Sequence, residues 1–161
     1  MPLFVHLTSD KLASRIRRGG IRPGYRGVFC LPVLPSYTLT HQWLRELKRR
    51  GQRTLVGVYF WLPDDEQVSV GHYNEPHQQM PAAEAVAFLM RLSEPLGYEV
   101  IVPRAIGSRE IRKVRSVRQV TGWRCTPDAH RRRLCQCPAC IRGEIKAQRR
   151  KVYYARRDGA R

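Results

Sequence analysis

The stretch Gly97-Tyr98-Glu99-Val100-Ile101-Val102-Pro103 places one carboxylate in a run of apolar and β-branched residues, a composition that favours a buried strand. Pro103 marks the end of this strand because proline cannot donate to a strand ladder. Most glutamates in such strands point to the solvated face. The alternative is that Glu99 faces a cleft and acts on a substrate.

The segments on either side of this strand predict a mixed α+β domain. Further strands are predicted at residues 3–7, 28–31, 54–62, 67–71 and 114–120, and helices at about 11–18, 37–50 and 82–92. Residues 54–62 and 67–71 are expected to form a hairpin, 73–81 an irregular loop and 108–113 a short turn or helix. In the first helix, Leu12 and Ile16 are expected to face the core.

The 161-residue chain is strongly basic, with 30 Lys and Arg against 13 Asp and Glu and a net charge of +17. The excess is uneven, because residues 104–161 hold 18 Lys and Arg against 4 Asp and Glu. A field of this sign attracts polyanions, of which nucleic acid is the commonest in a cell. We therefore expect DNA or RNA as a partner; the alternative is a basic surface that only confers solubility.

Four of the five cysteines lie close together near the C-terminal end of the chain. Cys135, Cys137 and Cys140 stand within six residues, Cys125 lies ten positions earlier, and His130 lies between. Three thiolates and a fourth ligand, either Cys125 or His130, fit a closed structural Zn²⁺ site. Free thiols and an iron–sulfur centre are the alternatives.

These features divide the chain into three parts. Residues 1–120 are predicted to form the α+β domain, 121–150 a zinc-binding basic extension, and 151–161 a basic tail for which disorder until binding is the expectation. No apolar run is long enough to cross a bilayer, and the N-terminus lacks the pattern of a signal peptide. We therefore expect a cytoplasmic protein with no membrane partner.

Three stretches in the α+β domain, in this order along the chain, resemble motifs of ADP-ribosyltransferases of the His-Tyr-Glu type, which include diphtheria toxin and the poly(ADP-ribose) polymerases. They are Leu3–Ser9 (LFVHLTS) with the helix and Gly-Gly-Ile after it, Gly27–Cys30 (GVFC) with the helix start at Tyr37–His41, and Tyr98–Val102 (YEVIV). More loosely, the same trio resembles the RNA 2′-phosphotransferases. The resemblance implies a split antiparallel sheet with flanking helices.

The resemblance also implies an activity, the transfer of ADP-ribose from NAD. Glu99 would bind the ribose 2′-hydroxyl and stabilise the positive charge that develops on the ribose. His6 would hydrogen-bond the adenosine-side ribose, and Thr8 would hold the ribose or cap the following helix.

Other residues near the first two motifs are candidates for binding NAD. The nicotinamide would stack on an aromatic ring, for which Phe29, Tyr37 and His41 are the candidates. Arg22 and Arg26 would bind the pyrophosphate, because a guanidinium matches its oxygens. The basic charge makes nucleic acid the expected acceptor. The alternative is a catalytically inactive transferase-like scaffold that binds nucleic acid with the help of its zinc-binding part.

Overall fold

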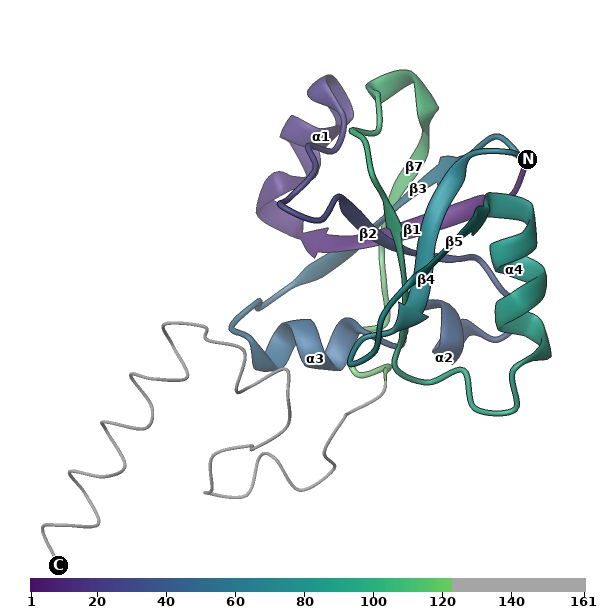
Figure 1. The fold of residues 1–161 in the computed structure, drawn as a ribbon. Coiled ribbons are helices and arrows are strands. Elements are labelled where there is room, and N and C mark those ends of the chain that lie inside the picture. The colour runs from purple at the N-terminus through teal and green to yellow at the C-terminus, as the bar shows by residue number, and fades with distance from the viewer. Residues whose placement is uncertain (123–161) are drawn as a thin grey trace, which may run out of the picture. The chain divides into compact units, whose positions relative to one another are not determined.

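The computed structural model describes residues 1–122, whose seven strands form one antiparallel sheet in the order β5-β4-β6-β2-β1-β3-β7 (Figure 1). The strands are β1 (Leu3–Ser9), β2 (Val28–Pro32), β3 (Leu55–Trp61), β4 (Gln67–His72), β5 (Gln78–Pro81), β6 (Tyr98–Val102) and β7 (Ile111–Ser116). The helices are α1 (Ala13–Gly19), α2 (Tyr37–Thr40), α3 (Leu44–Arg49) and α4 (Ala82–Arg91), with 3₁₀ turns η1 (Asp10–Leu12) and η2 (Ser108–Glu110). The predicted α+β class is confirmed.

Strand β2 divides the sheet into two halves. Its first three residues pair with β6, whereas Leu31 and Pro32 pair with Val5 and Phe4 of β1. Strands β1 and β2 therefore part after two residue pairs, while β1 continues beside β3 along its whole length. Where they part, backbone groups of β2 need partners other than a neighbouring strand.

The main core lies on one face of the sheet. Val100 and Val102 of β6 point into it together with Phe4 of β1 and Phe60 of β3. Helix α4 lies beside β4 and β5 (Figure 1) and buries three residues at helical spacing, Ala82, Ala85 and Leu89. Because side chains alternate along a strand, Glu99 faces away from this core. No helix among residues 1–122 is long and apolar enough to cross a membrane.

The single helix predicted over residues 37–50 is wrong, because a turn separates α2 from α3. Two side chains in this turn bind the backbone at the start of β6. The Gln42 side-chain oxygen accepts from Gly97 N at 2.7 Å, and Trp43 Nε1 donates to the Tyr98 carbonyl at 2.7 Å. The break in the helix therefore fixes the beginning of β6.

The predicted hairpin between residues 54–62 and 67–71 is also wrong. Both edges of β3 are occupied, by β1 and β7, so β4 pairs instead with β5 and β6. Strand β5 falls within residues 73–81, which were expected to be an irregular loop.

Two further expectations need correction. Strand β7 begins and ends earlier than the predicted 114–120, because η2 is only one turn long. Beyond β7, the side-chain amide of Gln119 makes the hydrogen bonds to Leu55 of β3 that a strand backbone would make. It donates to Leu55 O at 2.8 Å and accepts from Leu55 N at 3.1 Å. Leu12 is exposed rather than turned to the core, because it belongs to η1, whereas Ile16 of α1 is buried.

Candidate functional site

Glu99 lies on β6 with only 9% of its surface exposed. Two nitrogen-bearing side chains approach its Oε1 atom: Arg26 Nη1 at 3.4 Å and His77 Nε2 at 3.2 Å. Moving one carboxylate out of water costs several kcal/mol of desolvation free energy, unless the carboxylate is paired. These contacts allow the carboxylate to be buried in the sheet.

His77 reaches Glu99 because the residue opposite Glu99 on β4 is Gly71. A Cβ atom at Gly71 would lie 3.0 Å from both Cα and Cγ of His77. Glycine therefore lets the segment that carries His77 pack directly onto β4. His77 is absent from the site predicted by sequence, although a glycine inside a strand signals such a close approach.

Both ring nitrogens of His77 lie close to polar groups. Nε2 is 3.2 Å from the Glu99 carboxylate oxygen, a distance that makes an ion pair when the ring is charged. Nδ1 lies 3.3 Å from Arg26 Nη2, which only donates, and 3.1 Å from the Glu75 carbonyl, which only accepts. Nδ1 can accept from Arg26 when the neutral ring carries its hydrogen on Nε2, and it donates to Glu75 when the ring is charged.

A tight turn positions Arg26. Gly24 and Gly27 exchange backbone hydrogen bonds of 3.0 and 3.1 Å, which close a turn with Arg26 near its tip. Gly27 has a φ of 122°, and a Cβ there would lie 2.3 Å from a carbonyl oxygen of β6, so glycine is required. From this turn the guanidinium reaches Glu99 and lies 5.6 Å from the ring centroid of Phe29, which is 40% exposed.

His6 lies where β1 and β2 part. Its Nδ1 donates to the Phe29 carbonyl oxygen at 2.7 Å, which satisfies a backbone group that β1 does not pair. Desolvation lowers the pKa of His6, and the hydrogen bond opposes this only in part. His6 is therefore neutral near pH 7, with Nε2 as an acceptor. The contacts that connect His6 with Glu99 run through Phe29 and Arg26.

Two other predicted site residues flank these elements. Thr8 is buried on β1 and does not cap a helix. The residue directly before η1 is Ser9, and the Ser9 side chain makes no capping hydrogen bond. The predicted capping role of Thr8 is therefore wrong. Arg22 is exposed in the loop that leads to Arg26.

Tyr37 and His41 belong to a second cluster, whose third member is Tyr59 of β3. The rings of Tyr37 and His41 stack with centroids 4.1 Å apart. His41 Nδ1 faces the Tyr37 carbonyl at 2.9 Å and therefore donates, so Nε2 accepts from the Tyr59 hydroxyl at 2.9 Å. Burial lowers the pKa of His41 and raises that of Tyr59. Among the three aromatic candidates for the nicotinamide, Phe29 is the one in contact with a partner of Glu99.

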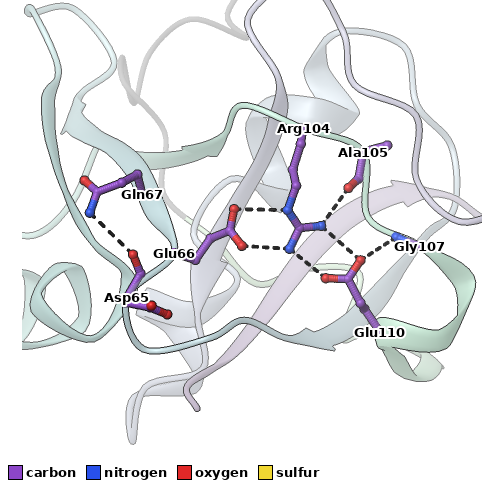
Figure 2. A network of polar contacts seen from close by, with 7 residues as sticks. All are labelled: Asp65, Glu66, Gln67, Arg104, Ala105, Gly107 and Glu110. Carbon is purple, nitrogen blue, oxygen red and sulfur yellow. Dashed lines mark hydrogen bonds and ion pairs between the residues drawn. The ribbon is translucent and has the colours of Figure 1, made fainter.

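A polar network elsewhere in the fold is centred on Arg104 (Figure 2). Its Nε and Nη2 donate to the two carboxylate oxygens of Glu66 at 3.0 and 2.8 Å, and Nη1 and Nη2 donate to Glu110 at 3.0 and 2.8 Å. These hydrogen bonds raise the pKa of Arg104 and lower that of Glu110. One guanidinium thus joins the turn before β4 to η2, and we interpret the network as structural.

The five predicted zinc ligands, Cys125, His130, Cys135, Cys137 and Cys140, lie outside the described residues. Within residues 1–122, no group of three or more His, Cys, Asp or Glu side chains is arranged to hold a metal ion. Cys30 of β2 is buried and free, and burial raises the pKa of its thiol.

Comparison with known proteins gives no match, whether to a protein family, a curated protein or a solved structure. The chemistry of the residues around Glu99 is therefore the basis for interpreting the site.

Proposed function

We propose that this chain is an NAD-dependent ADP-ribosyltransferase whose acceptor is a nucleic acid. The observation that carries the proposal is the buried carboxylate of Glu99, contacted by Arg26 and His77 beside the exposed ring of Phe29. The divided sheet supports it, because the resemblance of three motifs to ADP-ribosyltransferases implies a split antiparallel sheet.

Glu99 suits the chemistry of this reaction. Breaking the bond between nicotinamide and ribose builds positive charge on the ribose, and a fixed carboxylate stabilises that charge. Glu99 would also accept a hydrogen bond from the ribose 2′-hydroxyl. Its contacts with Arg26 and His77 restrict the carboxylate to one orientation, so less reorganisation is needed when charge develops.

The neighbouring residues would bind the rest of NAD. Neutral His6 offers Nε2 as an acceptor for the adenosine-side ribose hydroxyl, and Thr8 lies two residues further along β1. Phe29 would stack on the nicotinamide. Arg22 and Arg26 would bind the pyrophosphate, because a guanidinium matches its oxygens.

The test is an assay of the full chain with NAD and a mixture of DNA, RNA and protein acceptors. Nicotinamide release and the mass of any transferred ADP-ribose are measured for the natural chain, for Glu99→Gln and for Glu94→Gln, which changes an exposed carboxylate five residues earlier in the chain. We expect Glu99→Gln to lower turnover by about 100-fold or more, as the loss of a preorganised charge-stabilising group does. Equal turnover in the two variants would contradict the proposed role of Glu99.

A second candidate function is nucleic-acid binding by a catalytically inactive scaffold of the same kind. The net charge of +17 favours it, and the contacts of Glu99 are also compatible with a purely structural ion pair. In that case neither the natural chain nor Glu99→Gln would consume NAD, while both would bind nucleic acid equally and with a steep dependence on salt.

We also propose that residues 121–150 bind one structural zinc ion through Cys135, Cys137, Cys140 and either Cys125 or His130. Elemental analysis of the purified chain should find about one zinc per chain, as a single four-ligand site requires. Of the variants Cys125→Ser and His130→Gln, the one that loses zinc identifies the fourth ligand. A natural chain free of zinc after purification without chelators would contradict the site.

A further inference from the structure

A second surface, along β3 and β7, combines cationic and aromatic side chains. We define the β3–β7 strip as Tyr37, Tyr59, Trp61, Lys113, Arg115 and Arg118. The strand register pairs Tyr59 with Lys113 and Gly57 with Arg115, and paired residues point to the same face of a sheet. Alternation along β3 places Trp61 on this face too, opposite the face that buries Val58 and Phe60 in the main core.

Rings and cations of the strip contact one another. Lys113 Nζ lies 4.9 Å from the ring centroid of Tyr59, and the Arg118 guanidinium lies 5.4 Å from that of Tyr37. The Tyr37 hydroxyl also accepts a hydrogen bond from the Arg118 backbone N–H at 2.9 Å. The strip is therefore continuous with the cluster that holds His41.

The cations of the strip are not neutralised within the described part of the chain. Among residues 1–122, no carboxylate forms an ion pair with Lys113, Arg115 or Arg118. Glu110 is the one acidic residue in the segment 104–122, and it is bound by Arg104. The strip thus carries three positive charges that an external anion can reach.

Two rings of the strip remain open to solvent: Tyr37 is 38% exposed and Trp61 is 40% exposed. Lysines and arginines on an edge strand such as β7 also discourage pairing with another sheet. Edge protection accounts for the cations but not for exposed rings beside them. Cations that contact phosphates and rings that stack on bases are together the chemistry of single-strand binding.

We propose that the β3–β7 strip binds single-stranded nucleic acid, with Lys113, Arg115 and Arg118 on the phosphates and Tyr37 and Trp61 on unpaired bases. The strip would dock the acceptor of the ADP-ribosyl transfer, and in this respect alone the proposal rests on the proposed function.

The first test measures the binding of a fluorescently labelled single-stranded oligonucleotide by anisotropy, over a range of NaCl concentrations and without NAD. The strip variant carries Lys113→Gln, Arg115→Gln and Arg118→Gln. The control variant loses the same charge through Arg15→Gln, Arg18→Gln and Arg91→Gln, which are exposed on α1 and α4. Those two helices pack on the main core, on the other face of the sheet.

We expect the strip variant to bind at least about tenfold more weakly at moderate salt. A plot of the logarithm of its binding constant against the logarithm of the salt concentration should have a slope shallower by about 2. Each phosphate that the protein no longer neutralises reduces the size of that slope by about 0.7. The control variant should keep most of the natural affinity and slope. If the two variants lose the same affinity for the oligonucleotide, net charge alone explains binding. If neither loses affinity, the cations that bind the phosphates lie elsewhere in the chain. Either result would overturn the proposal.

The second test concerns the rings. Trp61→Leu should weaken binding about fivefold or more, because one base stack contributes about 1–3 kcal/mol. Tyr25→Leu, which removes a fully exposed ring in the turn before β2, should not. Natural affinity in Trp61→Leu would overturn the stacking role. Glu99→Gln should bind normally, so failure of the proposed reaction and failure of the strip are seen separately.

Discussion

At Gly71, the missing side chain decides whether His77 can touch Glu99. Gly71→Ala would place a methyl carbon 3.0 Å from the Cα atom of His77, so the segment 73–77 must shift. We expect a loss of about 1–3 kcal/mol of unfolding free energy from overpacking, together with lower NAD turnover. Urea unfolding and the turnover assay measure the two effects.

The matched control for that variant is Gly19→Ala. Among residues 1–122, no atom outside its chain neighbours and its own helix backbone lies within 4 Å of a Cβ at Gly19, at the end of α1, so this change should leave both quantities nearly unchanged. If Gly71→Ala also retains natural turnover, the contact of His77 with Glu99 has no part in the reaction.

Two histidines should make the fold sensitive to acid. Desolvation lowers the pKa of His6 and of His41 in the folded chain, whereas in the unfolded chain both return to about 6.5. Below that pH the unfolded chain binds more protons, so the free energy of unfolding falls, by at most about 1.4 kcal/mol per pH unit for each histidine. Urea unfolding between pH 7.5 and 5.5 should show this decrease.

The contribution of one of these histidines can be isolated with His41→Gln, which should reduce the dependence on pH. An unchanged pH dependence in the variant would show that His41 titrates alike in the folded and unfolded chains.

At this scale the sequence predicted a strand around Glu99 but not the side chains that contact the carboxylate. The buried strand around Glu99 was foreseeable because its neighbours are apolar. The approach of Arg26 and His77 was not, since it depends on close packing at Gly27 and Gly71 between segments far apart in the chain.

Among the elements, η2 and the turn before β4 are joined by Arg104. Arg104→Met would leave the partly buried carboxylates of Glu66 and Glu110 without their shared cation. We expect a loss of about 2 kcal/mol of unfolding free energy, less than for a fully buried pair because the guanidinium is partly exposed. Chemical denaturation measures this loss.

Arg109→Met is the matched control, since Arg109 lies exposed in the same 3₁₀ turn. We expect it to change the free energy of unfolding by about 0.5 kcal/mol or less. Equal effects of the two variants would mean that the Arg104 network adds nothing beyond a surface charge.

Most helices and strands were predictable, but their pairing was not. Alternation and apolar runs predicted β1, β2, β3, β4, β6 and α4 to within two residues. The β3–β4 hairpin failed because the partners of a strand depend on which other strands occupy its edges. The helix over 37–50 failed because residues 41–43 form a turn, in which the side chains of Gln42 and Trp43 bind the backbone at the start of β6.

For the whole molecule, charge was the most informative property of the sequence. The excess of Lys and Arg after residue 104 predicted an anionic partner, but composition does not show where that partner would bind. The register of β7 against β3 brings Lys113 and Arg115 beside aromatic rings, which is a three-dimensional property.

The divided sheet also has a consequence for how fast this chain folds. Paired residues of β1 and β3 are more than 40 positions apart, those of β2 and β6 at least 70, and β4 with β5 is a local hairpin. Such a high contact order is typical of folding in milliseconds to seconds rather than microseconds. On the ribosome, β2 therefore has to wait for β6 to be synthesised, and during that time its open edge is a target for chaperones or for aggregation.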